Sequence, residues 1–339
     1  MLHILTAAMN AVLPIVLLSV LGYFLKRIGF LTEQFSNVGS KIVFRICLAV
    51  TLFVNVYELK DFSSVPWDVV LYCLFFICLL FLLGLCSALW TTPVAARRGV
   101  ILHAVFRSNF AIIGLSLAAS LGGDEAMRVA SVVSAFAIPL YNVLGVISLT
   151  IFAGREGKHH TAISFVKDIF RNPMILGAIG GSFCILLRYL QAVVYGNVVF
   201  SLKDDLPFVF DTLNKLKSMT APLALLVLGA QFEFSAAKGL FKEIVAGTLW
   251  RLVLAPLLGV GVAVFLTQYT EWISFDVNAY PSLIALFGSP VAVSTAVIAS
   301  EMGGDEQLAT QLVIWSSLGS VITIYITVCI MMACGLLPV

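Results

Sequence analysis

The chain has 339 residues, of which 60% are hydrophobic and only 11% are charged, and its mean hydropathy is +1.05. Soluble proteins carry roughly 25% charged residues, so this composition excludes a water-facing surface over most of the molecule. The net charge of +2 is too small, and its basic residues are too scattered, to predict a nucleic-acid-binding protein. The expected surroundings are a lipid bilayer.

Apolar runs of about 20 residues, the length that crosses the hydrocarbon core of a bilayer, recur ten times along the chain. They lie at 4–26, 38–58, 67–92, 99–121, 127–153, 173–195, 206–232, 243–266, 279–300 and 307–335. The first run has no small-residue cleavage site and is followed by Lys26 and Arg27, so it is interpreted as a retained span. The sequence therefore predicts an all-α integral membrane protein with ten transmembrane helices.

The loop charges predict one orientation. Most basic loop residues fall on a single side of the ten spans: Lys26, Arg27, Arg97, Arg98, Arg155, Lys158, Lys167, Arg171, Lys238 and Lys242. The other side has little beyond Lys60, Arg128 and Lys203. Because cytoplasmic loops are enriched in Lys and Arg, we expect a multi-pass protein of the cell (plasma or inner) membrane with both termini extracytoplasmic.

Two segments of the chain resemble each other at an offset of 181 positions. Arg107–Ala111 leads through Ala118 to Gly122-Gly123-Asp124-Glu125, and Gly288–Ala292 leads through Ala299 to Gly303-Gly304-Asp305-Glu306. Chance similarity between two apolar helices that end in turn residues is the alternative. A true repeat divides the chain into five-helix units at 1–153 and 173–339, joined by a cytoplasmic linker at 154–172. An odd number of spans inverts the second unit, as in many secondary transporters.

Helix-breaking and small polar residues lie at matching depths of the fourth and ninth spans: Asn109 and Gly114 in the former, and Gly288, Ser289, Pro290, Ser294 and Thr295 in the latter. Proline removes an amide donor, glycine loosens the backbone, and short polar side chains satisfy freed backbone groups. These residues predict a binding site between two broken helices, with Asn142 of the fifth span as a neighbour. Two ordinary kinked helices with tight packing are the alternative.

Arg107 lies about two turns into the fourth span, at i, i+4 spacing from His103. A charge at that depth costs roughly 3 kcal/mol on insertion scales, so it usually has a task or a partner. Attraction of an anionic solute is one interpretation. The other is that Arg107 extends to the cytoplasmic surface, as we also expect of Arg45 and Arg251.

Several short stretches, in this order, resemble the auxin efflux carrier family, which includes plant auxin exporters and bacterial malate and malonate permease-like proteins. The stretches are Ser108-Asn109-Phe110-Ala111-Ile112-Ile113-Gly114-Leu115, Asn172-Pro173-Met174-Ile175, Ala221-Pro222-Leu223-Ala224-Leu225 with Gly229, Arg251-Leu252-Val253-Leu254-Ala255-Pro256, and Ser289-Pro290-Val291-Ala292-Val293-Ser294. The resemblance implies two inverted five-helix repeats with crossing broken helices 4 and 9, in a fold similar to bile-acid and Na⁺/H⁺ transporters. It also implies a homodimer and transport of organic acids.

The fourth span departs from the family pattern. Family members often have Gly-Ile-Pro-Leu there, whereas this chain reads Gly114-Leu115-Ser116-Leu117, and Ala49 stands where a second-span proline is frequent. Without the proline, we expect Gly114 and Ser116 to loosen the fourth span.

The predicted function is a secondary transporter that moves small organic anions, malate- or auxin-like, by alternating access as a uniporter or exchanger. The eighteen acidic residues fall in loops or near span ends, so the spans lack the buried carboxylates that usually couple transport to Na⁺ or H⁺. A Na⁺- or H⁺-coupled symporter that holds Na⁺ with carbonyls and hydroxyls, and a membrane sensor on the same fold, stay open as alternatives. The sequence has no catalytic motif, and its seven cysteines lack metal-ligand spacing, so we expect no enzyme, cofactor or metal site.

Overall fold

The computed structural model describes residues 2–58, 66–152, 173–270 and 275–337, and within these residues the regular secondary structure is helical. The predicted linker at 154–172 therefore lies outside the described residues. In chain order the helices are α1 (Leu2–Arg27), α2 (Glu33–Ile42), η1 (Val43–Cys47), α3 (Leu48–Tyr57), α4 (Trp67–Thr91), α5 (Ala95–Phe106), η3 (Phe110–Gly114), α6 (Leu115–Phe152), α8 (Pro173–Tyr195), α9 (Leu202–Asp205), α10 (Pro207–Gln231), α11 (Ala236–Gly239), α12 (Phe241–Leu249), η4 (Trp250–Leu254), η5 (Leu257–Gly261), α13 (Val262–Tyr269), α14 (Ala279–Gly288), α15 (Ser294–Glu301) and α16 (Glu306–Ala333). The elements labelled η are short π-helical stretches.

Within the described residues, six helical segments have the length and hydropathy to cross a membrane: Glu33–Tyr57, Trp67–Thr91, Leu117–Phe152, Pro173–Tyr195, Phe241–Tyr269 and Glu306–Ala333. Helices α1 and α10 have 26 and 25 residues and coincide with two further predicted spans. The predicted spans at 99–121 and 279–300 are each divided into shorter helices. The protein is therefore a multi-pass, helical membrane protein.

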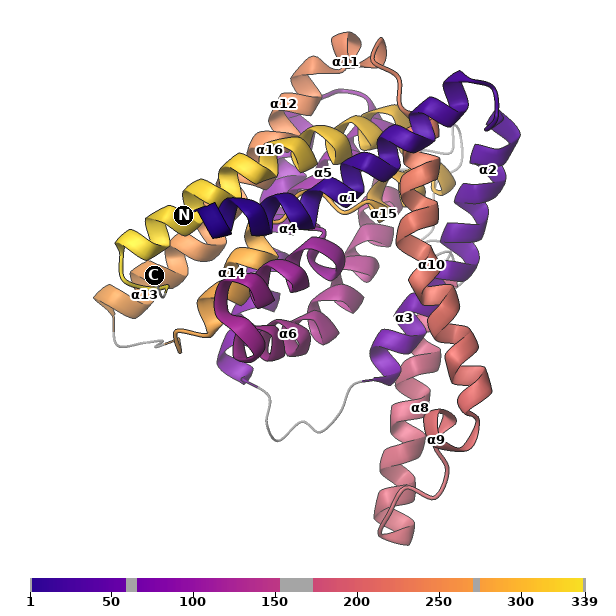
Figure 1. Ribbon diagram of the computed structural model, residues 1–339, viewed down its shortest axis with the longest axis vertical. Coiled ribbons are helices and arrows are strands. Elements are labelled where there is room, and N and C mark those ends of the chain that lie inside the picture. Colours follow the sequence, from indigo (N-terminus) through magenta and orange to yellow (C-terminus); the bar gives the residue numbers. More distant parts are fainter. Residues whose placement is uncertain (1, 59–65, 153–172, 271–274, 338–339) are drawn as a thin grey trace.

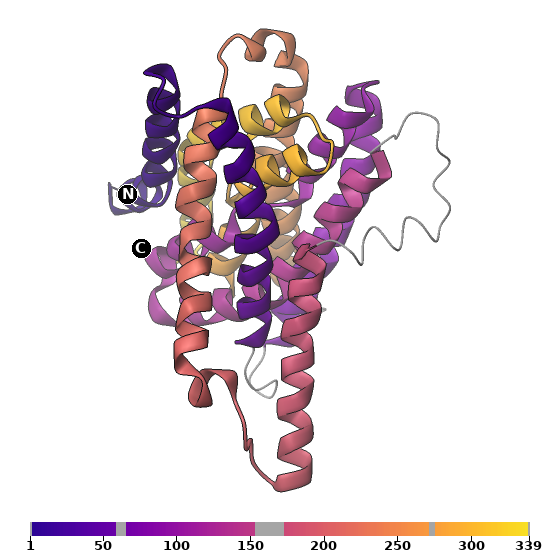
Figure 2. The ribbon, with the colours of Figure 1, turned by 90° about the vertical axis from the view of Figure 1, so that its right-hand side faces the viewer.

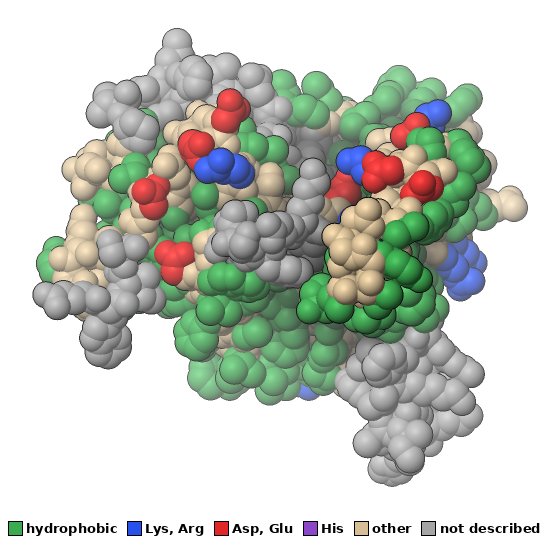
Figure 3. All heavy atoms as spheres, turned by 90° about the horizontal axis from the view of Figure 1, so that it is seen from below, with side chains coloured by type: hydrophobic (Ala, Val, Ile, Leu, Met, Phe, Trp, Pro, Cys, Tyr) green, Lys and Arg blue, Asp and Glu red, His purple; other side chains and the backbone are tan. Residues whose placement is uncertain are grey.

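The helices form two groups. One group contains α2, α3, α8 and α10, and Figure 2 shows α10, the α2–α3 segment and α8 as long, nearly parallel helices on one side of the molecule. The other group contains α4, α5, α6 and the helices from α12 to α16 (Figure 1). Helix α1 packs against both α10 and α16, so it lies between the groups. Seen from below in Figure 3, hydrophobic side chains cover much of the described surface, with a few Asp, Glu, Lys and Arg side chains among them.

Glycines end the two divided spans. Gly123 has a φ of 65° and Gly303 has a φ of 76°, a backbone region that other residues rarely adopt. The helical path is interrupted at Gly122 and Gly123, so α6 is two helices joined at a kink. Asp305 then caps the N-terminus of α16 by accepting a 2.9 Å hydrogen bond from the Leu308 amide. Both Gly-Gly-Asp-Glu strings therefore act as turn signals.

Candidate functional site

The two divided spans contact each other at the points where their helices are interrupted. Helix α5 ends at Phe106, and η3 begins only at Phe110; helix α14 ends at Gly288, and α15 begins at Ser294. Ser108 and Val291 form an isolated antiparallel bridge between the two interruptions. The Asn109 amide also donates a 2.8 Å hydrogen bond to the Pro290 carbonyl. The interrupted spans therefore cross, with backbone paired to backbone.

The two interruptions have different local causes. Ser289 is extended, with φ −65° and ψ 147°, because the residue before a proline is pushed out of the helical region. The first interruption has no proline and no glycine. It lies at Arg107–Asn109, where Arg107 is extended (φ −92°, ψ 109°), several residues before the expected loosening at Gly114 and Ser116. Pairing with the second interruption supplies the backbone hydrogen bonds that the first helix gives up.

Arg107 is buried in the protein, so the interpretation that it extends to the cytoplasmic surface is wrong. Its side chain is 5% exposed. One terminal nitrogen donates to Asn142 Oδ1 at 2.6 Å and to Ser294 Oγ at 2.9 Å. The other lies 3.3 Å from both His103 Nε2 and the Tyr141 carbonyl. None of these partners is a carboxylate, and no salt bridge to Arg107 occurs within the described part of the chain.

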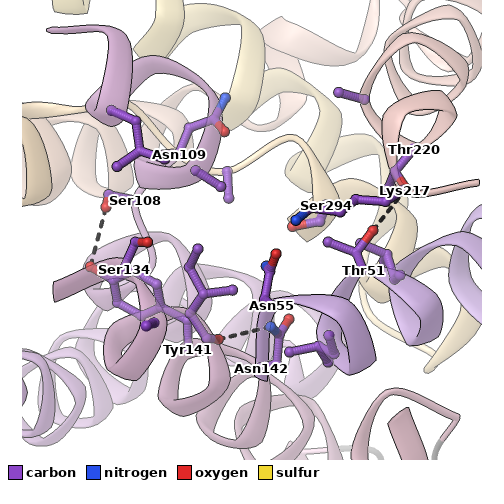
Figure 4. Close-up of a pocket in the computed structure, with 18 of the residues that line it drawn as sticks. Thr51, Asn55, Ser108, Asn109, Ser134, Tyr141, Asn142, Lys217, Thr220 and Ser294 are labelled. Atoms are coloured by element: carbon purple, nitrogen blue, oxygen red, sulfur yellow. Dashed lines mark hydrogen bonds between the residues drawn. The ribbon is translucent and has the colours of Figure 1, made fainter. Parts of the chain in front are cut away.

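A cavity of about 630 Å³ lies beside this crossing. Its polar lining comes from α3, the interruption before η3, α6, α10 and the start of α15: Thr51, Asn55, Glu58, Arg107, Ser108, Asn109, Arg128, Ser131, Ser134, Tyr141, Asn142, Lys217, Thr220 and Ser294. Figure 4 shows Thr51, Asn55, Asn142 and Ser294 pointing toward a common space. The cavity reaches the protein surface beside Glu58 and Arg128, whose side chains are 42% and 75% exposed.

Four of the eight predicted site residues line the cavity: Arg107, Asn109, Asn142 and Ser294. The other four, Gly114, Ser289, Pro290 and Thr295, belong to the crossing itself and are absent from the lining. Ser289 Oγ donates to the Ala285 carbonyl at 2.6 Å, in the last turn of α14. A Cβ on Gly114 would collide with the Phe110 ring and come within 3.1 Å of the Ala285 carbonyl oxygen. These residues therefore shape the crossing rather than the cavity wall.

Sequence reasoning missed the contribution of the second and seventh spans. Thr51 and Thr220 face each other with their hydroxyl oxygens 3.0 Å apart. At the surface end, Lys217 Nζ lies 3.1 Å from Glu58 Oε2. Two signals were available: Thr51 and Asn55 share a helix face at i, i+4 spacing, and Lys217 lies inside a predicted span.

Arg251 corrects a second expectation, because it does not extend to the membrane surface. Its side chain is 0% exposed. It hydrogen-bonds to the carbonyls of Val105, Phe106 and Phe287, on the two helices that end at the crossing. Arg45, by contrast, is 64% exposed, with Glu301 3.9 Å away.

Two interrupted helices that cross beside a solute-sized cavity define a class of membrane protein, that of carriers with discontinuous helices. The chain matches the membrane transport protein family over residues 7–328. It therefore belongs to this family, and the resemblance to the auxin efflux carriers is confirmed.

Two archaeal proteins are similar to the chain. An uncharacterized transporter of Methanocaldococcus jannaschii is 28% identical over 256 residues, which cover 73% of this chain and 76% of that protein. An uncharacterized transporter of Methanothermobacter thermautotrophicus is 22% identical over 324 residues, which cover 93% of this chain and 95% of that protein. Family and relatives alike are transporters, a class distinct from enzymes.

Proposed function

We propose that the protein is a secondary transporter of small organic anions, which bind in the cavity with their carboxylate at Arg107. The observation that carries the proposal is a buried guanidinium that lines the cavity without an acidic partner in the described residues. Arg offers several donors in a planar fork that matches a carboxylate. Asn142 and Ser294 orient that fork, and Asn109 adds a side-chain amide whose nitrogen has no hydrogen-bond partner within the described ranges.

The rest of the cavity wall suits the carbon skeleton of an organic acid. Leucine, valine and alanine side chains lie between the polar groups, among them Leu48, Leu52, Leu115, Val132 and Ala221. Apolar walls with a few convergent polar groups are typical of sites for small molecules. The malate-like or auxin-like substrate class is part of the proposal, and the wall composition supports an acid with an apolar portion.

For the fold we propose ten spans in two inverted five-helix repeats, 1–153 and 173–339, around the linker 154–172. The crossing of the fourth and ninth spans at equivalent depth supports this arrangement. The carrier is then a multi-pass protein of the plasma or inner membrane with both termini extracytoplasmic, and it forms a homodimer. Under that topology the cavity opens to the extracytoplasmic side, where Glu58, Arg128 and Lys217 lie.

Alternating access requires the opposite end of the site to be closed in this state. Two glutamines of α16 supply contacts to the end of α10: Gln307 Nε2 donates to the Gln231 carbonyl at 3.3 Å, and Gln311 Nε2 donates to the Glu233 carbonyl at 2.7 Å. We call this pair the glutamine latch. It joins α16 to the end of α10 and to the residues just after it, and we expect it to break when the cavity opens to the cytoplasm.

For the energetics we propose uniport or exchange. Among the described residues, the one carboxylate of the cavity lining is Glu58, which lies at the surface end and pairs with Lys217. An anion would then move with its own gradient and with the membrane potential, which is worth about 2.3 kcal/mol per charge at 100 mV. One observation favours a Na⁺-coupled alternative: Thr295 is fully buried, and its hydroxyl has no hydrogen-bond partner among the residues that the structure describes.

Uptake into proteoliposomes tests the function. Radiolabelled L-malate, malonate and indole-3-acetate serve as probes, with protein-free liposomes and labelled choline as controls. We expect saturable uptake of at least one acid, inhibited by the others in proportion to their affinity, and no choline uptake. Saturable binding without any flux would instead identify a sensor. If a wider set of carboxylates showed no binding and no flux, the proposal would be contradicted.

A further inference from the structure

Arg251 lies at the centre of a long membrane-spanning segment, Phe241–Tyr269, on the π-helical turn η4 (Trp250–Leu254). Single π-helical turns inside α-helices frequently occur at functional positions. The side chain is 0% exposed, and it is absent from the cavity lining. A guanidinium this deep in a membrane protein is costly, so its partners must compensate for its lost hydration.

Those partners are backbone carbonyls at two helix ends. One terminal nitrogen of Arg251 donates to the Val105 carbonyl at 3.1 Å and to the Phe106 carbonyl at 3.2 Å. The other donates to the Phe287 carbonyl. Val105 and Phe106 are the last two residues of α5, and Phe287 is the penultimate residue of α14.

The last carbonyls of a helix have no partner within the helix, and together they carry about half a negative charge. Both half-helices that end at the crossing direct this negative end toward Arg251. In transporters with interrupted helices, unwound carbonyls and half-helix C-termini are the groups that coordinate a coupling Na⁺. A guanidinium tied to the chain occupies that position here.

We propose that Arg251 is the resident cation of the crossing, a positioning residue that takes the place of a dissociable coupling ion. It fixes the ends of α5 and α14, and thereby the neighbouring Arg107–Asn109 segment, without binding the solute. Because its charge cannot leave, the crossing needs no Na⁺ to assemble. The inference rests on the proposed function only where it concerns coupling; the structural role stands without it.

Rescue by small cations tests the inference. Arg251→Ala should leave room for a free cation between three carbonyls that have lost their donors. We expect its Tm in detergent to fall by roughly 5 to 10 °C, because buried acceptors without partners are costly. Millimolar methylguanidinium should restore at least half of that loss saturably, and NaCl should restore part of it. Choline chloride at equal ionic strength should have no effect, and wild-type Tm should respond to none of these salts.

Arg45→Ala is the matched control, since Arg45 also lies on a π-helical turn but is 64% exposed. It should keep the wild-type Tm and gain nothing from methylguanidinium. If a folded, monodisperse Arg251→Ala protein gains no stability from any small cation, or if the control gains as much, the inference is wrong.

If Arg251→Ala does not fold, a second pair of variants tests the inference. Arg251→Lys keeps a charge within reach of the carbonyls, and Arg251→Met keeps the volume without the charge. We expect the lysine variant to purify with a higher Tm than the methionine variant, and equal behaviour would overturn the inference. These readouts require no transported solute, so a failed uptake assay leaves them interpretable. Where uptake is found, sodium dependence that appears in Arg251→Ala and is absent from wild type would support the substitution of a coupling ion.

Discussion

Two buried arginines lie at the crossing, and only one of them, Arg107, is among the residues described as lining the cavity. On the cavity side, Arg107 bonds mainly to side-chain and ring atoms, and an anionic solute is expected to join them. Arg251 is absent from the cavity lining, and its hydrogen bonds within the described residues go to backbone carbonyls at helix ends. The two arginines therefore differ in their expected roles. Arg107 contacts side chains that a bound solute can also contact, whereas Arg251 holds the backbone of two helix ends in place.

The comparison also explains why neither charge needs an acidic partner. A membrane-buried arginine usually pairs with an opposite charge or with backbone carbonyls. Here the helix dipoles supply part of that negative charge to Arg251, and the proposed substrate supplies it to Arg107. We expect the unpaired guanidinium of Arg107 to make the empty cavity attract anions and disfavour cations.

The largest expected effect comes from substitutions at the crossing. Pro290→Leu restores an amide and a helix-compatible residue, and Asn109→Ala removes a side-chain amide from the cavity. We expect each variant to reduce transport at least 10-fold while expression and Tm stay near wild type. Uptake at saturating solute measures this, with Ser182→Ala on the exposed face of α8 as the control. Normal transport by both variants would show that transport does not depend on these residues of the crossing.

A smaller effect is expected from weakening the glutamine latch. Such a variant tests whether these contacts hold the two helix groups together. Gln311→Leu removes the 2.7 Å hydrogen bond to the Glu233 carbonyl. Loss of one hydrogen bond, worth about 1 kcal/mol, should raise the inward-facing population by up to about fivefold. Spin labels at the exposed Phe234 and Leu318 report the distance between the two helix groups. A distance distribution identical to wild type would show that the latch is not a gate.

The smallest effect on the protein is expected from single cysteine substitutions. They test to which side of the membrane the cavity opens. In a cysteine-free background, single cysteines at Gly157 and Ala237 should be shielded from an impermeant thiol reagent in intact cells. A cysteine at Arg128, beside the cavity opening, should be labelled. The predicted orientation follows from the basic loops. Ready labelling at Gly157 and Ala237 would reverse it, and with it the assignment of the open side.

Much of the helical pattern could be predicted because it depends on local composition. The predicted spans at 67–92 and 173–195 match α4 and α8 closely, since apolar runs of that length fit a bilayer-spanning helix. The interruption at Ser289 also followed from a local cause, its neighbour Pro290. Local signals were sufficient in these regions.

The remaining features depend mainly on contacts between spans that lie far apart in the sequence. The first interruption lies at Arg107–Asn109 because its backbone pairs with Pro290 and Val291, and neither proline nor glycine marks it. Arg251 was expected at the surface because nothing in its own span reveals carbonyls brought from α5 and α14. Thr51 and Lys217 joined the cavity through packing between spans far apart in the sequence.

The central claim is that Arg107 binds the carboxylate of an organic anion. The most direct test measures uptake of the best probe acid into proteoliposomes with the membrane potential clamped. It compares wild type, Arg107→Gln and the control Lys217→Gln, whose residue lines the surface end of the cavity. The account predicts an apparent KM 10- to 100-fold higher for Arg107→Gln, because a hydrogen bond to a charged group is worth about 1.5–3 kcal/mol. Lys217→Gln should change KM less, and imposed Na⁺ or pH gradients should drive no accumulation above electrochemical equilibrium. An unchanged KM in a folded Arg107→Gln protein would contradict the proposal that Arg107 binds the carboxylate.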